Sequence, residues 1–379
     1  MNKQRHLIVI DPTAFAGGSK VATESILSLL DSQQFRITVL TADKQSWLSK
    51  QINRVNVYEP KCLAQKEQGI GYFIRHGVLA LQLLWARLRF GRIDVALGAS
   101  GPGVDLALYL LRPLMQFPII QLIHGPVAQS RTIARCLQAA QHVHYLQSSI
   151  DSLNTSLATI GHPKTALPRH FHRFENGLNE KQWPSECQRI QPVVFWAASL
   201  LKWKGLDLLL EVLKQLPEKQ RPITNICYIK PQSVQLPVSD APVKINNVVW
   251  YENPKDIDTI RANANIFVST SHQEPFGLSI LEAMAAGQCV LIPADGAYWD
   301  QVLTDHINCI KYLPQQAEDL QQKLIMLTQD MALVKRLGQQ ASLLARGYSA
   351  SQQYQRIIKH IDNSQPQIST KIRVNRGLV

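Results

Sequence analysis

A chain of 379 residues is too long for one ordinary hydrophobic core, so the length predicts two domains. The 45% hydrophobic and 18% charged content fits a globular protein, and six scattered cysteines without a CxxC pair argue against a disulfide framework or a zinc ribbon. The net charge of +12 suits nucleic acid, an anionic membrane surface or phosphorylated substrates as partners, and the excess is larger in residues 1–180 (+8) than in residues 181–379 (+4).

Targeting signals are not evident. The N-terminal sequence MNKQRHLIVIDP has only a four-residue apolar run, which is too short for a signal peptide. No segment approaches the roughly 18 consecutive apolar residues of a transmembrane helix. We therefore expect a cytoplasmic protein that either stays in solution or lies on the inner face of the membrane.

The first half alternates short apolar strands with helical segments, which predicts a doubly wound α/β layer structure. The expected strands are HLIVID (6–11), RITVLTA (36–42), VALGAS (95–100), FPIIQLIHG (117–125) and HVHYLQ (142–147). The expected helices lie near 20–31, 67–90, 103–114 and 149–159.

The pattern restarts after a polar stretch at 174–192, the best candidate for a linker. The expected strands are VVFWAAS (193–199), NICYIK (225–230), NVVWYE (247–252), NIFVST (265–270) and CVLIPA (289–294), and the expected helices lie at 205–216, 254–263, 315–328, 330–346 and 349–361. This predicts two Rossmann-like domains facing each other across a cleft. The predicted divisions are 1–180, 181–348, a final helix at 349–362 that crosses back to the first domain, and a mobile tail at 363–379.

Two glutamates stand out in the segment EPFGLSILEAMAAG, which follows the strand at 265–270. Glu274 precedes Pro275, which favours the first position of a helix, and Gly277 leaves the backbone uncovered at that helix start. The free N–H groups of such a first turn bind anions such as phosphate. Glu282 lies in an apolar helix and needs a partner, which could be ligand hydroxyls such as those of a ribose, a nearby backbone group or a buried arginine.

The segment EPFGLSILEAMAAG resembles the E-x7-E signature of the retaining glycosyltransferases of the GT-B fold, family 4 type, and the likeness extends over nearly the whole chain. The resemblance implies a nucleotide-sugar donor, such as a UDP- or GDP-sugar, bound mainly by the second domain, and no cofactor. Glu274 would contact hydroxyls of the transferred sugar and Glu282 those of the ribose. The backbone of Phe276, Gly277 and Leu278 would lie near the diphosphate.

The segment AASLLKWKG (197–205) resembles a second block of the family, in which a lysine neutralises the leaving diphosphate. Lys204 matches that lysine, whereas Ser199 stands where the family has an arginine, and Lys202 is the residue that could compensate. An alternative reading is therefore a degenerate GT-B protein that binds a nucleotide sugar or a partner without transfer.

Three positions of the first half complete the expected site. Gly17 and Gly18, in the loop after the first strand, permit close approach of the backbone to a ligand; in the family this loop borders the donor phosphates. His124 ends a predicted strand, where the family often has a histidine near the donor sugar. The resemblance implies transfer with retained configuration by a hexosyltransferase-type enzyme, in which the leaving phosphate takes the proton of the acceptor.

No metal is expected. His142 and His144 share one face of a strand, as do His170 and His172 if that segment is extended, but further ligands are not evident. The acids of the DID sequence, Asp256 and Asp258, are interpreted as helix-start acids. Nucleic acid is not expected as a partner, because basic charge without a basic–aromatic motif is weak support.

The acceptor is expected to be a glycan or a lipid-linked molecule of polysaccharide or lipopolysaccharide assembly, as the resemblance implies. The segment YFIRHGVLALQLLWARLRFGR (72–92) is an apolar helix with arginines near its ends. It could lie on an anionic membrane surface beside such an acceptor, or it could simply pack on the sheet with its basic ends exposed.

Overall fold

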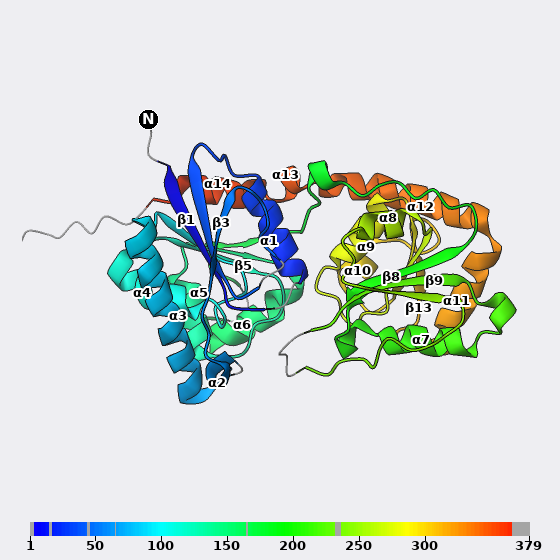
Figure 1. The fold of residues 1–379 in the computed structure, drawn as a ribbon, viewed down its shortest axis with the longest axis horizontal. Helices are drawn as coiled ribbons and strands as arrows, with labels where there is room; N and C mark the ends of the chain where they lie inside the picture. Colours follow the sequence, from blue (N-terminus) through cyan, green and yellow to red (C-terminus); the bar gives the residue numbers. More distant parts are fainter. Residues whose placement is uncertain are drawn as a thin grey trace, which may run out of the picture.

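The fold consists of two α/β units that lie side by side (Figure 1). The computed structural model describes residues 4–14, 17–43, 46–64, 66–163, 166–231 and 236–365. Each unit has a parallel sheet with helices on both faces, so the predicted α/β architecture of two Rossmann-like domains is confirmed.

The first unit holds a seven-stranded parallel sheet in the order β3–β2–β1–β4–β5–β6–β7. Its core strands are sandwiched between helices, and Leu7, Ile8, Val9 and Ile10 of β1 are fully buried, which explains their continuous apolar sequence. The strands are β1 (Arg5–Asp11), β2 (Phe35–Thr41), β3 (Ile52–Asn56), β4 (Val95–Gly98), β5 (Ile119–Ile123), β6 (His142–Tyr145) and β7 (Phe171–Arg173). The helices are α1 (Gly18–Ser28), α2 (Lys61–Ala64), α3 (Gly69–Phe90), α4 (Leu106–Met115), α5 (Arg131–Ala139), α6 (Ile150–Ala158) and the 3₁₀ turns η1 (Gln147–Ser149) and η2 (Glu180–Gln182).

The second unit holds a six-stranded parallel sheet in the order β10–β9–β8–β11–β12–β13. The strands are β8 (Val193–Ser199), β9 (Ile223–Ile229), β10 (Val248–Glu252), β11 (Ile266–Val268), β12 (Cys289–Pro293) and β13 (Ile310–Tyr312). The helices of this unit are α7 (Leu206–Gln215), α8 (Ile257–Ala262), α9 (Leu278–Ala285), α10 (Tyr298–Val302), α11 (Ala317–Gln329) and α12 (Met331–Ala345), with the 3₁₀ turns η3 (Lys202–Lys204), η4 (Glu218–Gln220) and η5 (Arg346–Tyr348). Two further helices, α13 (Ala350–Gln353) and α14 (Gln355–Asn363), follow them.

The strand order places the ligand-binding edge of each sheet. The chain reverses its direction of winding between β1 and β4 in the first sheet and between β8 and β11 in the second. In open α/β sheets, ligands bind beyond the carboxyl ends of the strands at such a switch point. Both switch points open toward the space between the two units.

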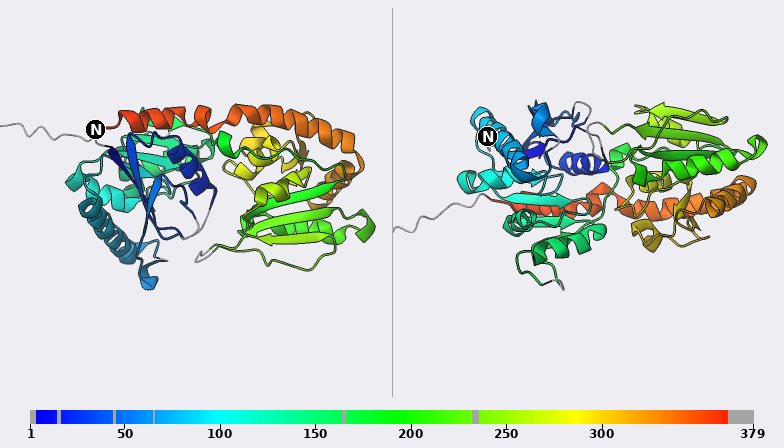
Figure 2. Two further views of the ribbon diagram at one scale, coloured as in Figure 1. Left: turned by 45° about the horizontal axis from the view of Figure 1, so that its top comes forward. Right: turned by 90° about the horizontal axis from the view of Figure 1, so that it is seen from below.

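The end of the chain returns to the first unit. Helix α12 lies along the second unit, and α13 and α14 continue over the first one (Figure 2). Tyr354 is fully buried and its hydroxyl accepts a hydrogen bond of 3.0 Å from the backbone N–H of Gly177. Gly177 must be small, because a Cβ there would lie 2.8 Å from the backbone of Ala350. The linker and the final helices therefore form one packed junction between the units.

Several elements differ from the sequence prediction. Strands β3, β7 and β13 and helices α2 and α10 were not predicted, because they are short or, like β3 at the sheet edge, carry few buried residues. Helix α5 was also not predicted, although it has nine residues and four of them are buried. The predicted final helix is two helices separated at Tyr354. The exact domain divisions stay a prediction; the last strand of the first sheet ends at Arg173 and the first strand of the second sheet begins at Val193. The predicted tail lies outside the described residues after position 365.

Candidate functional site

A cleft of about 890 Å³ lies between the two units, at the carboxyl ends of the strands beside both switch points. Its walls come from the loops after β1, β4 and β5 in the first unit and from those after β8, β9 and β11 in the second. All of the site residues predicted from the sequence line it: Gly17, Gly18, His124, Ser199, Lys204, Glu274, Phe276, Gly277, Leu278 and Glu282.

Helix α9 begins later than its sequence suggests. Pro275 was predicted to open it, but the helix starts at Leu278, after Gly277 with φ +81°. The reason is that Phe276 is drawn into the interior, where it packs on Tyr298 and Trp299 at ring separations of 4.9 and 5.2 Å. The Trp299 indole also donates a 3.2 Å hydrogen bond to the carbonyl of Gly277.

This conformation leaves an anion seat at the start of α9. The backbone N–H groups of Leu278 and Ser279 have no backbone acceptor among the described residues, and the first helical bonds run from Ile280 and Leu281 to the Gly277 carbonyl. Free N–H groups at the positive end of a helix dipole favour a phosphate. A Cβ on Gly277 would approach both Ile280 and Glu274 to about 3 Å, so glycine is required by its φ and by its neighbours.

The start of α1 faces this seat from the first unit. Gly17 caps α1, whose first residue is Gly18, and a Cβ on Gly18 would lie 3.5 Å from Cδ1 of Leu278. A Cβ on Gly125 would likewise lie 3.9 Å from Cγ of Pro275. The glycine loop therefore comes close to the start of α9, and two helix N-termini, one from each unit, border the same part of the cleft.

Lys20, next to the glycine loop, is not available to a ligand. Its Nζ pairs with carboxylate oxygens of Asp11 at 2.9 Å and Asp43 at 3.0 Å, and it donates to the carbonyl of Thr13. All three charged side chains are buried. A buried lysine with these partners stabilises the loop rather than binding an anion.

Lys204 and Glu274 form an ion pair at the cleft, with Lys204 Nζ 2.5 Å from Glu274 Oε2. Both side chains are about one-sixth exposed, at 17% and 15%. The position of Lys204 is fixed from both sides, since its carbonyl accepts from Thr270 Oγ1 at 3.0 Å and its ammonium lies 4.1 Å from the Trp203 ring centroid. The cleft thus carries a paired cation and anion next to the anion seat.

Gly205 allows this arrangement. Its φ of +71° belongs to the left-handed region, and a Cβ there would lie 2.0 Å from the carbonyl oxygen of Thr270. Thr270 belongs to the loop that leads to Glu274. Glycine at position 205 therefore lets the turn of Lys204 approach the loop of Glu274.

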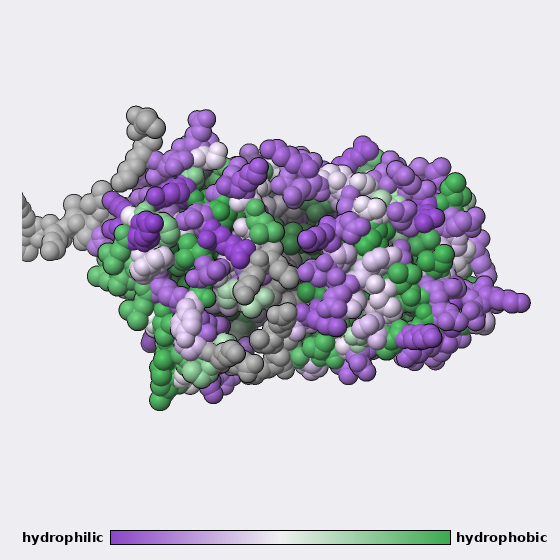
Figure 3. All heavy atoms as spheres, in the orientation of Figure 1, coloured by the Kyte–Doolittle hydropathy of each residue, from purple (hydrophilic) through white to green (hydrophobic). Residues whose placement is uncertain are grey.

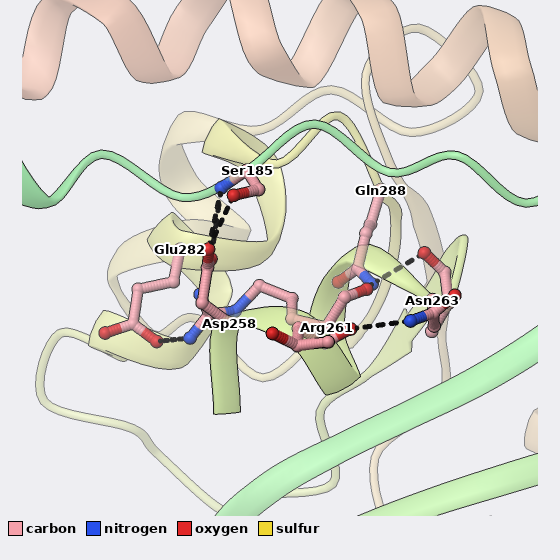
Figure 4. Close-up of polar contacts among 8 residues, drawn as sticks. Ser185, Asp258, Arg261, Asn263, Glu282 and Gln288 are labelled. Atoms are coloured by element: carbon pink, nitrogen blue, oxygen red, sulfur yellow. Dashed lines mark hydrogen bonds and ion pairs between the residues drawn. The ribbon is translucent and has the colours of Figure 1, made fainter. Parts of the chain in front are cut away.

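Glu282 is partly buried and already has a protein partner (Figure 4). Its Oε2 accepts a hydrogen bond of 2.6 Å from Nη2 of Arg261, and its side chain is 25% exposed. Arg261 is buried, also contacts Asp258 Oδ1 at 3.1 Å, and lines the cleft. Of the partners considered for Glu282, the buried arginine is therefore present, whereas Oε1 of Glu282 has no hydrogen-bond partner within the described part of the chain.

Arg261 was missed by the sequence reading. It lies on α8, 21 residues before Glu282, and the signal that could have found it is a lone arginine five residues before the apolar strand β11. Asp258 is held by the linker, because Ser185 donates to it through both its backbone N–H and its hydroxyl (Figure 4). The structural interpretation of this acid, on the first turn of α8, agrees with these contacts.

His124 follows β5 and lies in the first-unit wall of the cleft. Both ring nitrogens are buried and have no hydrogen-bond partner among the described residues. Burial lowers the pKa of His124 to about 4, so the imidazole is neutral at pH 7. A neutral imidazole can donate one hydrogen bond and accept another, which suits a ligand hydroxyl.

Ser199 ends β8 and lines the cleft, but the residue suggested to compensate for it does not. Lys202 is exposed and is absent from the cleft wall, because the turn η3 directs Trp203 and Lys204 inward instead. The expectation that Lys202 replaces the missing arginine is therefore not supported.

Comparison with solved structures gives the fold. HepE from Anabaena, in a crystal with UDP-glucose, matches with a TM-score of 0.71 and 14% identity over 94% of this chain and 99% of that one. WaaG, described as a glycosyltransferase involved in lipopolysaccharide biosynthesis, matches with a TM-score of 0.63 and 15% identity over 94% of this chain and all of that one. The chain has the GT-B fold.

Sequence comparison adds a family match for the second GT-B domain. Residues 179–343 match the family described as Glycosyl transferases group 1, and this region contains Lys204, Arg261, Glu274 and Glu282. The lipopolysaccharide glucosyltransferase WaaG of Escherichia coli (strain K12) is 26% identical over 159 residues. That alignment spans 41% of this chain and 40% of the relative's length.

Proposed function

We propose that this protein is a glycosyltransferase that binds a nucleotide-sugar donor in the cleft and transfers the sugar, with retention of configuration, to a glycan or lipid-linked acceptor. The group 1 match of residues 179–343 and the GT-B fold support a group 1 glycosyltransferase. The observation that carries the proposal is the Lys204–Glu274 pair beside the open N-terminus of α9.

The donor diphosphate is assigned to the start of α9, opposite α1. Lys204 reaches the same place, so the two negative phosphates would meet two helix N-termini and one ammonium. Glu274 would then accept hydrogen bonds from hydroxyls of the sugar, and Glu282 Oε1 from those of the ribose. Arg261 is the positioning residue for Glu282, since it holds the other oxygen.

The proposed reaction breaks the bond between the anomeric carbon and the diphosphate oxygen. The acceptor hydroxyl forms the new bond to that carbon from the same face, and its proton passes to the departing phosphate. Lys204 and the helix amides stabilise the charge that develops on the diphosphate, the kind of effect that is often the largest in catalysis. We propose that no divalent metal is required, because these groups supply the positive charge.

UDP-glucose is the donor to test first, because HepE, of the same fold, was crystallised with it. The relation to WaaG supports a role in lipopolysaccharide or other cell-surface polysaccharide assembly. An acceptor of that class is either a glycan or a glycan joined to a lipid.

A lipid-linked acceptor would be reached from the membrane surface. Within the described ranges, the structure has no helix that is long and apolar enough to cross a bilayer. Helix α3 packs Leu79 and Leu83 inward but leaves apolar side chains exposed on its other side, and Figure 3 shows apolar atoms gathered over α3 and α4. The exposed residues are Ile70, Phe73, Ile74, Leu81, Trp85, Leu88, Leu110 and Leu114.

Arginines at the end of α3 accompany this apolar face, namely Arg87 and Arg89. We propose that it lies on an anionic membrane, where apolar burial and basic charge act together. Cosedimentation with phosphatidylglycerol vesicles should decrease in Leu88→Asp and remain unchanged in Ile190→Asp, an equally exposed residue of the linker. Equal binding of both variants would contradict this assignment.

The experiment for the main proposal measures release of UDP from UDP-glucose, with and without candidate glycan acceptors, in the presence of a chelator. Glu274→Gln should lose turnover at least 100-fold, whereas Glu186→Gln, which is exposed on the linker, should retain it. Nuclear magnetic resonance of the product should show the donor's α-configuration retained.

The alternative, a protein that binds the donor without transfer, is motivated by Ser199. Ser199→Arg separates the two readings: a large gain in rate in the variant alone would indicate a disabled site, and similar rates in both would indicate a working variant of the family. Binding without turnover in both proteins would contradict the proposed activity.

A further inference from the structure

Four histidines gather on the first unit where α14 packs against it, away from the cleft. They come from three elements: His142 and His144 from β6, His172 from β7, and His360 from α14. The parallel register places His172 beside His144, and the returning helix adds His360, which is 216 residues after His144 in the sequence. The ligand that the sequence reading did not find is thus supplied by α14.

We propose that His142, His172 and His360 form a binding site for a divalent transition metal of the zinc type, with His144 as the positioning residue. One nitrogen of each of the three rings lies within 4.8 Å of those of the other two. His142 Nδ1 and His172 Nε2 are 3.3 Å apart. Two ligands of a tetrahedral zinc ion at 2.0–2.1 Å lie about 3.3–3.4 Å apart, so this pair already has the required spacing.

The third ring requires only a local movement. His360 stacks on His142, with ring centroids 3.7 Å apart and planes 14° from parallel, and lies 4.7 Å from the His172 ring. Tilting the imidazole of His360 out of this stack would direct a nitrogen between the other two. All three side chains are partly exposed, which gives an ion access to them.

His144 contacts one of the three proposed ligands, His360. It is fully buried, and its Nε2 lies 3.0 Å from Nδ1 of His360, a contact that orients the ring of His360. Metal-bound histidines usually hold their orientation through such an outer contact. Its own Nδ1 has no partner within the described residues.

The type of ligand indicates which metal the site would bind. The three side chains each offer an imidazole nitrogen, and the site has no carboxylate among its three proposed ligands. Arg356 and Lys359 of α14 add positive charge nearby, which opposes a cation. Imidazole prefers zinc, copper or nickel, whereas magnesium prefers oxygen ligands.

The ion would join the two parts of the chain that α14 connects. β6 and β7 belong to the first sheet, whereas α14 follows the last helices of the second unit. Metal binding would therefore fix the final helix on the first unit. The proposal does not depend on glycosyl transfer, since none of these histidines lines the cleft.

The test measures Zn²⁺ bound to the tag-free, full-length protein by equilibrium dialysis and metal analysis, with Co²⁺ as a spectroscopic probe. We expect the parent protein to bind about one zinc per chain. In His360→Gln and in His172→Gln, we expect the dissociation constant for zinc to be at least tenfold larger. His144→Gln should weaken binding about 10–100-fold. His162→Gln is the control, because His162 is partly exposed and, among the described residues, its ring has a hydrogen-bond contact only with the carbonyl of Pro163.

The Co²⁺ spectrum distinguishes this site from a thiol site. Ligation by imidazoles gives visible d–d bands without a thiolate charge-transfer band, whereas binding at the exposed Cys62 would show that band. Circular dichroism of each variant checks that it is folded. The proposal would be overturned if the protein bound no zinc or if the Co²⁺ spectrum showed thiolate ligation. It would also be overturned if zinc bound equally well to His360→Gln, His172→Gln and His162→Gln.

Discussion

Replacing Arg261 tests how Glu282 is held. The guanidinium is only 5% exposed and contacts Glu282 at 2.6 Å and Asp258 at 3.1 Å, whereas these carboxylates are 25% and 45% exposed. Breaking a fully buried pair costs about 3–5 kcal/mol and an exposed one about 0.2–1 kcal/mol. Because only one partner is deeply buried, we expect Arg261→Met to lower the free energy of unfolding of the second domain by about 2–3 kcal/mol.

A double-mutant cycle with Glu282→Gln separates the pair from the rest of the packing. We expect a coupling free energy of about 1.5 kcal/mol, since the hydrogen bond joins two charged groups. Urea unfolding can be followed by tryptophan fluorescence, because five of the seven tryptophans lie after residue 181. Arg336→Met is the control: Arg336 is exposed and, within the described ranges, its side chain bonds only the His306 carbonyl, so its loss should cost under about 0.5 kcal/mol. A coupling near zero would refute the assigned pairing.

Three further outcomes are expected. Gly205→Ala should destabilise the protein by more than about 2 kcal/mol, because of its φ of +71° and the 2.0 Å approach to a carbonyl, whereas Gly347→Ala, with open space around it, should be nearly neutral in urea unfolding. Burial lowers the pKa of His76 to about 4, so between pH 6.5 and 4 the unfolded state binds more protons than the folded state. The free energy of unfolding should therefore decrease as the pH falls from 6.5 to 4. This decrease should be less steep in His76→Leu. Lys204→Gln should reduce the rate of UDP release at least 100-fold and Lys202→Gln less than threefold; similar losses in both would contradict the role of Lys204.

The architecture could be predicted from the sequence because buried parallel strands are continuous apolar segments. Segments such as VVFWAAS and CVLIP are buried almost throughout, and they were predicted nearly to their ends. Strand β3 pairs only at the sheet edge, and β7 and β13 are three residues long, so their patterns were too weak to see. Local periodicity therefore identifies interior strands better than edge strands.

Details of the site depended on contacts between distant segments. The start of α9 moved from Pro275 to Leu278 because Phe276 packs on aromatic residues that lie more than 20 positions later. The sequence predicted that Glu282 has a hydrogen-bond partner and limited it to ligand hydroxyls, a backbone group or a buried arginine. It did not identify Arg261, because α8 and α9 come together only in the folded protein. His360 joined the histidines of β6 and β7 for the same reason.

The most direct test of the central claim is binding of the nucleotide to Glu282. Thermal unfolding of the parent protein and of Glu282→Gln should be measured with UDP, GDP, ADP, CMP and dTDP and their sugar conjugates, in the presence of a chelator. The account predicts stabilisation by one nucleotide class, roughly 2.7 kcal/mol at 100 times its dissociation constant, which is strongly reduced in the variant. Stabilisation of the parent and the variant to the same extent, or of neither by any nucleotide, would contradict the account.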